Sequence, residues 1–261
     1  MAHLPGQGGA EPRAVGRAGV VPGTRCGLVG GNGHGRRGGR CPAVVVGRKG
    51  TTILSSLRVT PTPDVVLASS SPRRQAILTA AGIRFEVLPP AIDDALLPAA
   101  TDDPARLTMG LAWFKARQAL SALAPRGEPG APRLVLAADT VCVVDGRIVG
   151  KPADAADARA MVRALEGRSH DVVTGLCVAD RRSGARTLLA DRATVTLGAL
   201  PAGELDRYVA SGAWQGKSGG YNYGERAAAG WPLACAGDPE TVMGLPSRLV
   251  LPLLAAFGRA A

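Results

Sequence analysis

The chain has 261 residues, of which 46% are hydrophobic and 3% aromatic, and it carries a formal net charge of +10 at pH 7. Its length is sufficient for one large domain or two small ones with a substantial core. We find no run of about 18 apolar residues that would span a membrane, and no apolar segment typical of a secretory signal.

The positive charge is concentrated in residues 1–63, which contain nine Lys or Arg and one acidic residue, Glu11. Residues 64–261 contain 22 basic and 20 acidic residues. Because residues 1–63 are rich in Gly, Arg and Pro without sustained periodicity, we predict a disordered basic extension there and a folded domain over residues 64–261. The extension is interpreted as a basic arm for nucleic acid or anionic membrane, as an organelle transit peptide, or as a segment without function that an upstream start adds.

The folded domain begins with Val65–Gln75, VVLASSSPRRQ. Val65–Leu67 is a short apolar strand, and the serines after it are expected to cap the next helix by accepting hydrogen bonds from its free N–H groups. Pro72 suits the first helical position, where no N–H is needed. A strand is therefore predicted to lead directly into a helix that continues from Gln75 to Ala81.

Two adjacent arginines, Arg73 and Arg74, lie in the first turn of this helix. Cations oppose the partial positive charge of a helix N-terminus, so an anion is expected to offset them. Exposed N–H groups and guanidinium groups in one place are typical of a phosphate site. The alternative interpretation is an ordinary capped helix with two solvated arginines.

Alternating strand and helix patterns after residue 64 predict an α/β fold. The dipeptide Asp145–Gly146 between apolar runs predicts a hairpin that returns through Ile148 and Val149. The other expected elements are a strand at Phe85–Leu88, a helix at Pro104–Leu123, strands at Leu134–Ala138 and Val141–Val144, a helix at Asp154–Leu165, strands at Val172–Ala179 and Thr187–Thr196, and a helix at Ala202–Ser211.

One acidic residue and two lysines stand out among these elements. Asp139 directly follows an apolar run and is expected at the end of a buried strand, where acidic residues commonly face the ligand crevice of an open sheet; its alternative role is to cap a turn. Lys115 and Lys151, taken singly, are more typical of solvated lysines. The Pro104–Leu123 helix is predicted to have an otherwise apolar face at Leu107, Leu111, Phe114 and Lys115.

Three other patterns limit the chemistry. The segment around Lys217 falls short of a phosphate-binding P-loop, because Ser211 stands where that pattern requires glycine. The five cysteines are dispersed, which suits reduced thiols in a cytoplasm and disfavours a disulfide scaffold or a zinc site. His170 is the only histidine after residue 63, which disfavours a histidine-rich metal site or a Ser-His-Asp hydrolase.

Six motifs follow one another along residues 64–260. They are SSSPRR at Ser69–Arg74, the lysine of LAWFKA at Lys115, AADT at Ala137–Thr140, GKP at Gly150–Pro152, GKSGGY at Gly216–Tyr221 and VMGLP at Val242–Pro246. In this order they resemble the Maf-like family of nucleoside triphosphate pyrophosphatases, in the ITPase-like superfamily. The resemblance covers essentially all of residues 64–260 and none of residues 1–63.

The resemblance implies an α/β fold with a mixed, elongated sheet flanked by helices and a central nucleotide cleft. It implies hydrolysis of a nucleoside triphosphate between its α and β phosphates, with Mg²⁺ or Mn²⁺, to a monophosphate and diphosphate. Asp139 would be the catalytic general base, directly or through a metal held by Asp139 and by Asp94 or Asp93. The substrate-binding residues would be Ser69, Ser71, Arg73, Arg74, Lys115, Thr140, Lys151, Lys217 and Glu225.

One segment departs from the family pattern. Members that act on dTTP and UTP carry a glutamine at the position of Gly224; either Glu225 substitutes for it after a shift of one residue, or another base is preferred. Asn222 and Tyr223 also replace the usual small and aliphatic residues, whereas Thr140 agrees with the dTTP/UTP type. The expected substrate is a dTTP-like or UTP-like nucleotide or a modified one.

Two functions of other classes compete with hydrolysis. One is a nucleotide-binding regulatory protein linked to septum formation, with secondary activity. The other is a nucleic-acid binder that uses the basic extension, although no interleaved aromatic residues support base stacking there. We expect a cytoplasmic enzyme whose partner is a nucleoside triphosphate, with neither membrane nor nucleic acid bound; a monomer and a homodimer are both left open.

Overall fold

The computed structural model describes residues 65–91, 101–126 and 132–259, without the side chains of residues 258 and 259, and these residues belong to one compact unit. The predicted basic extension and the loop with Asp93 and Asp94 lie outside the described residues. None of the helices within the described ranges is both long and apolar enough to cross a membrane. In chain order the elements are β1 (Val65–Leu67), α1 (Pro72–Ala80), β2 (Phe85–Val87), α2 (Pro104–Leu123), β3 (Leu134–Val144), β4 (Arg147–Val149), α3 (Ala155–Leu165), β5 (Arg168–Asp180), β6 (Arg186–Leu197), α4 (Glu204–Ala210), the 3₁₀ helix η2 (Ser218–Gly220), α5 (Tyr223–Ala228), β7 (Leu233–Ala236), α6 (Pro239–Met243) and α7 (Ser247–Arg259).

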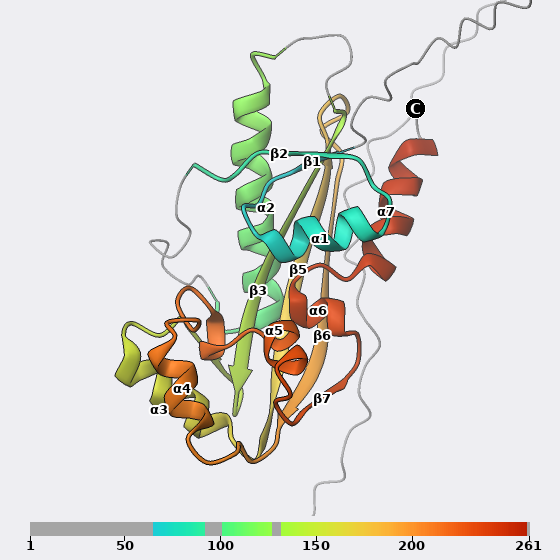
Figure 1. The fold of residues 1–261 in the computed structure, drawn as a ribbon. Helices are drawn as coiled ribbons and strands as arrows, with labels where there is room; N and C mark the ends of the chain where they lie inside the picture. The colour runs from blue at the N-terminus through green and yellow to red at the C-terminus, as the bar shows by residue number, and fades with distance from the viewer. Residues whose placement is uncertain (1–64, 92–100, 127–131, 260–261) are drawn as a thin grey trace, which may run out of the picture. The chain divides into compact units, whose positions relative to one another are not determined.

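The strands form one seven-stranded sheet in the order β2-β1-β3-β5-β6-β7, with β4 also paired to β3. β1 runs parallel to β2 and β3, and the other pairs are antiparallel. The long strands β3, β5 and β6 have 11, 13 and 12 residues and run side by side (Figure 1). A mixed sheet flanked by helices confirms the predicted fold class.

Strand β3 passes through Asp139 without a break and continues to Val144, so the predicted strand end at Asp139 is wrong. Asp139 lies opposite Gly175 of β5, and Thr140 lies opposite Thr174. Backbone hydrogen bonds to a neighbouring strand keep polar residues in a strand as well as apolar ones. The local sequence pattern does not reveal which residues have such a neighbouring strand. Asp139 and Thr140 are therefore consecutive mid-strand residues, and their side chains point to opposite faces of the sheet.

The hairpin after β3 matches its prediction. Asp145 and Gly146 have φ angles of 49° and 75°, as a tight two-residue turn requires, and Val144 pairs with Arg147 across it.

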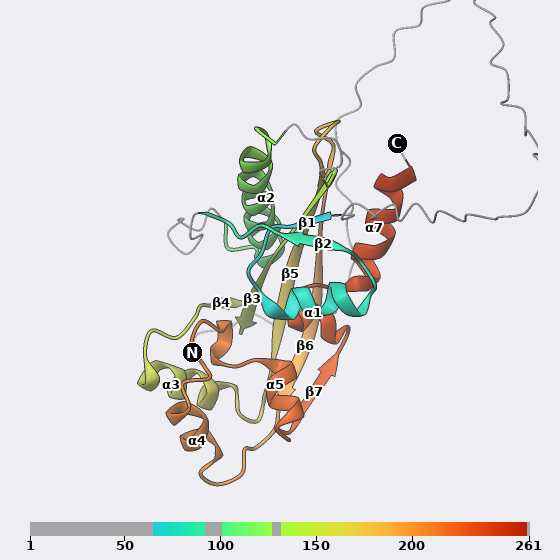
Figure 2. The same cartoon turned by 45° about the horizontal axis from the view of Figure 1, so that its top comes forward.

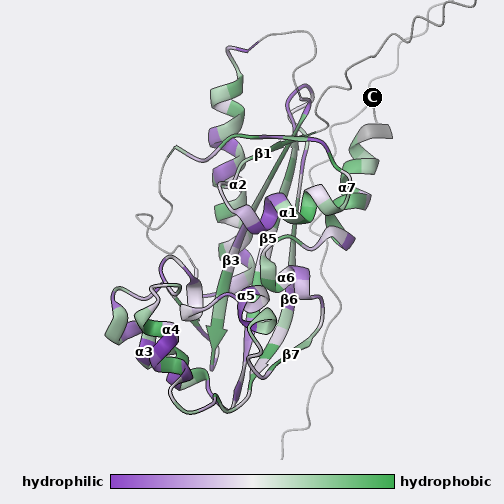
Figure 3. Cartoon of the chain, viewed as in Figure 1, coloured by the Kyte–Doolittle hydropathy of each residue, from purple (hydrophilic) through white to green (hydrophobic). Residues whose placement is uncertain are grey.

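Helices cover both faces of the long strands (Figures 1 and 2). The even-numbered residues of β3 from Leu134 to Ala138 belong to a buried cluster with residues of α1 and α7. The odd-numbered residues Val135 and Ala137 pack against α2 on the opposite face. Because both faces are covered, β3 is apolar over most of its length (Figure 3).

Helix α2 buries mostly small side chains instead of the predicted stripe at Leu107, Leu111 and Phe114, whose side chains are only partly buried. Small residues let the helix backbone approach β5, and a Cβ atom at Gly175 would lie only 2.3 Å from the carbonyl carbon of Thr108. The face with small side chains is therefore the buried one, because it allows close packing of α2 against the sheet. The buried residues are Thr108, Ala112, Ala116, Ala119 and Leu123.

Replacement of Gly175 by alanine is expected to lower the free energy of unfolding by about 1–3 kcal/mol, because the added methyl group forces α2 away from the sheet. Urea denaturation of the full chain measures this change. The matched control is Gly110→Ala, an exposed glycine of α2 with open space around its Cβ position, which is expected to be neutral or stabilising. Equal stability of the Gly175→Ala variant and the unmodified chain would show that the close approach is not required.

A separate aromatic cluster supports the glycine-rich segment before α5. Tyr208, Trp214, Tyr221 and Trp231 pack together with residues of α3 and α4. The Tyr208 hydroxyl donates to the Gly220 carbonyl oxygen at 2.9 Å. This contact fixes a segment in which glycine backbone, with φ of 72° at Gly219, would otherwise be free to vary.

Candidate active site

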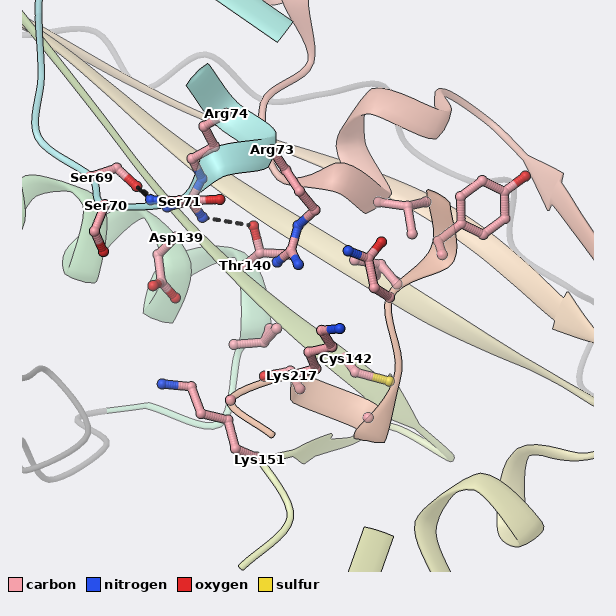
Figure 4. Close-up of a pocket in the computed structure, with 18 of the residues that line it drawn as sticks. Ser69, Ser70, Ser71, Arg73, Arg74, Asp139, Thr140, Cys142, Lys151 and Lys217 are labelled. Atoms are coloured by element: carbon pink, nitrogen blue, oxygen red, sulfur yellow. Dashed lines mark hydrogen bonds between the residues drawn. The ribbon is translucent and has the colours of Figure 1, made fainter. Parts of the chain in front are cut away.

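A cavity of about 690 Å³ opens at one edge of β3. On this edge β1 pairs only with Leu134–Leu136, and β4 pairs only with Cys142–Val144. No described strand covers the intervening residues, so side chains from both faces of the sheet reach the same space. The lining comes from residues 69–74 after β1, residues 139–142 of β3, Lys151, Lys115 of α2 and most of residues 215–223 (Figure 4).

The serines after β1 do not cap α1 through their side chains, contrary to the prediction. Ser71 is the N-cap residue, but its hydroxyl makes no capping hydrogen bond. The buried hydroxyl of Ser69 accepts hydrogen bonds from the Ser71 backbone N–H at 3.2 Å and from Arg74 Nη1 at 3.0 Å. A charged guanidinium is a stronger donor than a neutral N–H, so the arginine changes the role of the serine. Pro72 occupies the first helical position as predicted.

The two adjacent arginines have different environments. The Arg74 guanidinium donates from Nε to the Gly244 carbonyl oxygen at 2.9 Å, from Nη1 to Ser69, and from Nη2 to the Thr140 hydroxyl at 3.2 Å. Arg73 is exposed and lines the cavity, and no hydrogen bond joins its guanidinium to a described residue. Figure 4 shows both side chains extending from the start of α1. Arg74 is therefore oriented by the protein itself, whereas Arg73 is available to a ligand.

Asp139 and Lys115 form a largely buried ion pair. Lys115 Nζ lies 2.6 Å from Asp139 Oδ1, and the two side chains are only 13% and 12% exposed. Lys115 reaches the carboxylate from α2, which the missing side chain at Gly175 allows to lie close to the sheet. The interpretations of Asp139 as a turn cap and of Lys115 as a solvated lysine are wrong. Both were based on local sequence, which does not reveal that α2 and β3 bring these two side chains together.

Two further lysines, Lys151 and Lys217, lie across the cavity from Ser69–Ser71 (Figure 4). The Gly219 N–H donates a hydrogen bond to the Gly150 carbonyl oxygen at 3.1 Å. This bond joins the two loops that carry these lysines.

Glu225 is not part of the cavity wall. Its Oε2 lies 2.6 Å from Lys217 Nζ, and its Oε1 accepts a hydrogen bond from Asn222 Nδ2 at 2.6 Å. Partial burial raises the pKa of Glu225, but the hydrogen bond and charge of Lys217 outweigh burial and leave this pKa below its usual value. The ionised carboxylate thus holds two side chains that do line the cavity.

The remaining part of the wall is uncharged and combines polar side chains with apolar ones such as Val172 and Val242. His170 Nε2 lies 2.9 Å from the Tyr221 hydroxyl, and its Nδ1 has no hydrogen-bond partner among the described residues. Burial lowers the pKa of His170 to about 4 and raises the pKa of the Cys142 thiol to about 12. At neutral pH the imidazole is therefore neutral and the thiol protonated, so Cys142 is a poor nucleophile.

The structure brings together all but two of the predicted site residues. Glu225 contacts residues of the wall but does not line the cavity, and Asp94 lies outside the described residues. No group of three or more His, Cys, Asp or Glu residues that could hold a metal occurs within the ranges that the structure describes. The predicted residues that line the cavity are Ser69, Ser71, Arg73, Arg74, Lys115, Asp139, Thr140, Lys151 and Lys217.

Some residues of the site carry no sequence signal of their own. Thr174 enters through contacts with Thr140 and the Thr241 carbonyl oxygen, far from it in the chain, whereas Asn222 is held by its near neighbour Glu225. Gly244 belongs to the VMGLP motif, and that motif alone does not reveal that its carbonyl oxygen holds Arg74. Only the strand register, which places Thr174 opposite Thr140, could have pointed to Thr174.

Comparison with known proteins gives consistent matches. Residues 64–257 match the family model described as "Maf-like protein". A dTTP/UTP pyrophosphatase of Burkholderia pseudomallei is 42% identical over 190 residues, which are 70% of this chain and 88% of that protein. Proteins of the same name from Symbiobacterium thermophilum and Pelotomaculum thermopropionicum are 42% and 37% identical over 196 and 195 residues, 75% of this chain and 94% and 97% of theirs.

Proposed function

The chain belongs to the Maf-like protein family, and on that basis we propose that it hydrolyses a nucleoside triphosphate between the α and β phosphates to a monophosphate and pyrophosphate. Family membership confirms the resemblance found in the sequence. The observation that carries the proposal is one cavity with five cationic side chains and one carboxylate. A purely regulatory nucleotide-binding role is not favoured, because the similar proteins are named as enzymes.

The cationic side chains would bind the triphosphate from two sides. Arg73 and Arg74 approach from the start of α1, and Lys151 and Lys217 approach from the opposite wall. Fixed charges around a partly enclosed cavity stabilise charge that develops on the phosphates in the transition state, without reorganising when it forms. Arg74 fits this role best, since three protein acceptors already orient it.

Asp139 would accept the proton of the attacking water. It is the one carboxylate among the described residues of the cavity wall. The ion pair with Lys115 holds the Oδ1 atom at 2.6 Å from the ammonium group and leaves the carboxylate at the cavity. A positioned base of this kind contributes about 10²- to 10⁴-fold to a rate.

The donor set fits a divalent cation that arrives with the triphosphate. Mg²⁺ is commonly held by one or two carboxylates together with substrate phosphates and water. Asp139 supplies one carboxylate, and Asp94, outside the described residues, would supply the second. When bound, Mg²⁺ or Mn²⁺ would neutralise phosphate charge.

The nucleobase would lie at the uncharged end of the cavity, and Asn222 would contact it. A Cβ atom at Gly224 would lie 3.7 Å from Asn222 Oδ1, so this carboxamide lies beside the point where a glutamine side chain at residue 224 would begin. An amide offers both a donor and an acceptor, which suits the hydrogen-bonding edge of uracil or thymine. Asn222 thus takes the role that the sequence pattern assigned to Glu225.

A turnover screen of the full chain with Mg²⁺ tests the proposed function. The substrates are dTTP, UTP, 5-methyl-UTP, CTP, ATP and GTP, and the readout is released pyrophosphate. We expect dTTP, UTP and 5-methyl-UTP to be hydrolysed faster than the purine nucleotides. The proposal would be overturned if none of these six nucleotides released pyrophosphate.

Replacement of Glu225 by glutamine is expected to lower KM for dTTP by about twofold to fivefold. The change removes a negative charge that competes with the triphosphate for Lys217, and an exposed ion pair is worth about 1 kcal/mol or less. Steady-state kinetics measure the effect. The matched control is Glu86→Gln, which removes the ion pair with Arg126 away from the cavity and leaves KM unchanged. A rise in KM at Glu225→Gln would indicate that the carboxylate itself serves the substrate.

A further inference from the structure

Thr174 of β5 is fully buried and does not itself line the cavity, although it contacts a residue that does. It lies directly opposite Thr140 in the β3–β5 pairing, and the two hydroxyl oxygens are 2.9 Å apart. The Thr174 hydroxyl also lies 2.7 Å from the Thr241 carbonyl oxygen in α6. Thr174 therefore connects the strand that carries Asp139 and Thr140 with the helix before the VMGLP turn.

The protons in this chain of hydrogen bonds have only one arrangement. A carbonyl oxygen only accepts, so Thr174 donates its single hydroxyl proton to Thr241. Thr140 must then donate to Thr174, because the Thr174 proton is already used. At the other end the Arg74 guanidinium only donates, so the Thr140 oxygen accepts from Nη2. Every bond in the chain points from Arg74 towards α6.

The chain closes into a ring at Gly244. The Gly244 N–H donates to the Thr241 carbonyl oxygen at 3.1 Å, and the Gly244 carbonyl oxygen accepts from Arg74 Nε at 2.9 Å. Gly244 has a φ of 98°, and a Cβ atom there would lie 2.9 Å from the Thr140 hydroxyl oxygen and 3.2 Å from Arg74 Nε. Glycine is therefore required at the point where the ring closes.

We infer that Thr174 is a positioning residue, which acts through Thr140 and the Thr241–Gly244 turn to hold Arg74 in the orientation that phosphate transfer needs. This inference rests on the proposed function. A guanidinium held along its Nε–Nη2 edge by a closed hydrogen-bonded ring keeps its positive charge in a fixed position and orientation. Thr140 acts in the same ring, so its hydroxyl helps to orient Arg74.

The kinetic test is a double-mutant cycle between Thr174 and Arg74. Thr174→Val keeps the shape of the side chain and removes the hydroxyl; it is expected to lower kcat about tenfold with little change in KM. Thr174→Ser, which keeps the hydroxyl, is expected to restore most of kcat. In an Arg74→Ala background the valine substitution is expected to change kcat less than twofold, because the group that it positions is absent.

Two controls separate positioning from a general loss of structure. Thr196→Val removes a hydroxyl pair with Ser169 elsewhere in the same sheet and is expected to leave kcat unchanged. A purely structural role of Thr174 predicts the same loss of kcat with and without Arg74. That result, or a Thr174→Val variant with unaltered kcat, would overturn the inference.

A second readout does not depend on the reaction. In the full chain labelled with ¹⁵N at arginine, the Arg74 Nε–H signal, identified by its loss in Arg74→Lys, is expected to exchange slowly with water. Thr174→Val should make this exchange several-fold faster, and Thr174→Ser should not. An unchanged exchange rate of this signal in Thr174→Val would contradict the ring. If the exchange becomes faster in Thr174→Val but the unmodified chain releases no pyrophosphate, the ring stands and the proposed function alone is overturned.

Discussion

Replacement of Asp139 by asparagine is expected to lower kcat for pyrophosphate release by about three orders of magnitude. Asparagine fills the same space in β3 but cannot accept the proton of an attacking water. The affinity for a non-hydrolysable triphosphate analogue should not fall, because the substitution removes a negative charge from the cavity wall. Steady-state kinetics and isothermal titration calorimetry measure the two quantities on the same variant.

Asp180 provides the matched control for Asp139. It is a still more deeply buried aspartate, ion-paired with Arg133 near the far end of the β3–β5 pairing, and the hydrogen bond from Arg133 holds the pKa of its carboxyl well below the usual range. Asp180→Asn is expected to lower the free energy of unfolding and to keep kcat. If Asp139→Asn retained kcat, or if both variants lost it equally, Asp139 would not be the base.

Replacement of Arg74 by lysine is expected to lower kcat/KM about 100-fold, mainly through kcat. A lysine keeps the positive charge but cannot donate along a rigid fork to Gly244, Ser69 and Thr140 at once. The group that stabilises the transferring phosphate would then no longer be fixed in place. Steady-state kinetics with dTTP measure both parameters.

The neighbouring arginine is the control for Arg74. Arg73→Lys is expected to lower kcat/KM less than about tenfold, mainly through a higher KM, because the side chain of Arg73 is exposed and holds no position in the hydrogen-bonded ring. An equal or larger loss at Arg73 would mean that orientation by the protein does not determine which arginine serves the reaction.

Local patterns were sufficient where the cause of a structure is local. Pro72 begins α1, Asp145 and Gly146 make the β3–β4 turn, and α2 has its predicted bounds, because each depends on the conformational preferences of a few adjacent residues. The ordered motifs, from SSSPRR to VMGLP, were likewise sufficient to indicate the family.

The wrong predictions concern side-chain and strand contacts that the local patterns do not encode, some between near neighbours and some between elements distant in the chain. Ser69 was expected to cap α1, but Arg74 takes its hydroxyl. The buried face of α2 depends on close packing against Gly175, which no pattern within the helix encodes. The ring through Thr174 joins four elements, so only the register of β3 against β5 could have revealed it.

The most direct measurement is the identity of the products. The full chain is incubated with dTTP and Mg²⁺, and the phosphorus-containing products are followed by ³¹P NMR, with Asp139→Asn as the inactive control. We expect equal amounts of dTMP and pyrophosphate, as cleavage between the α and β phosphates requires. Formation of dTDP and orthophosphate would contradict the proposed reaction.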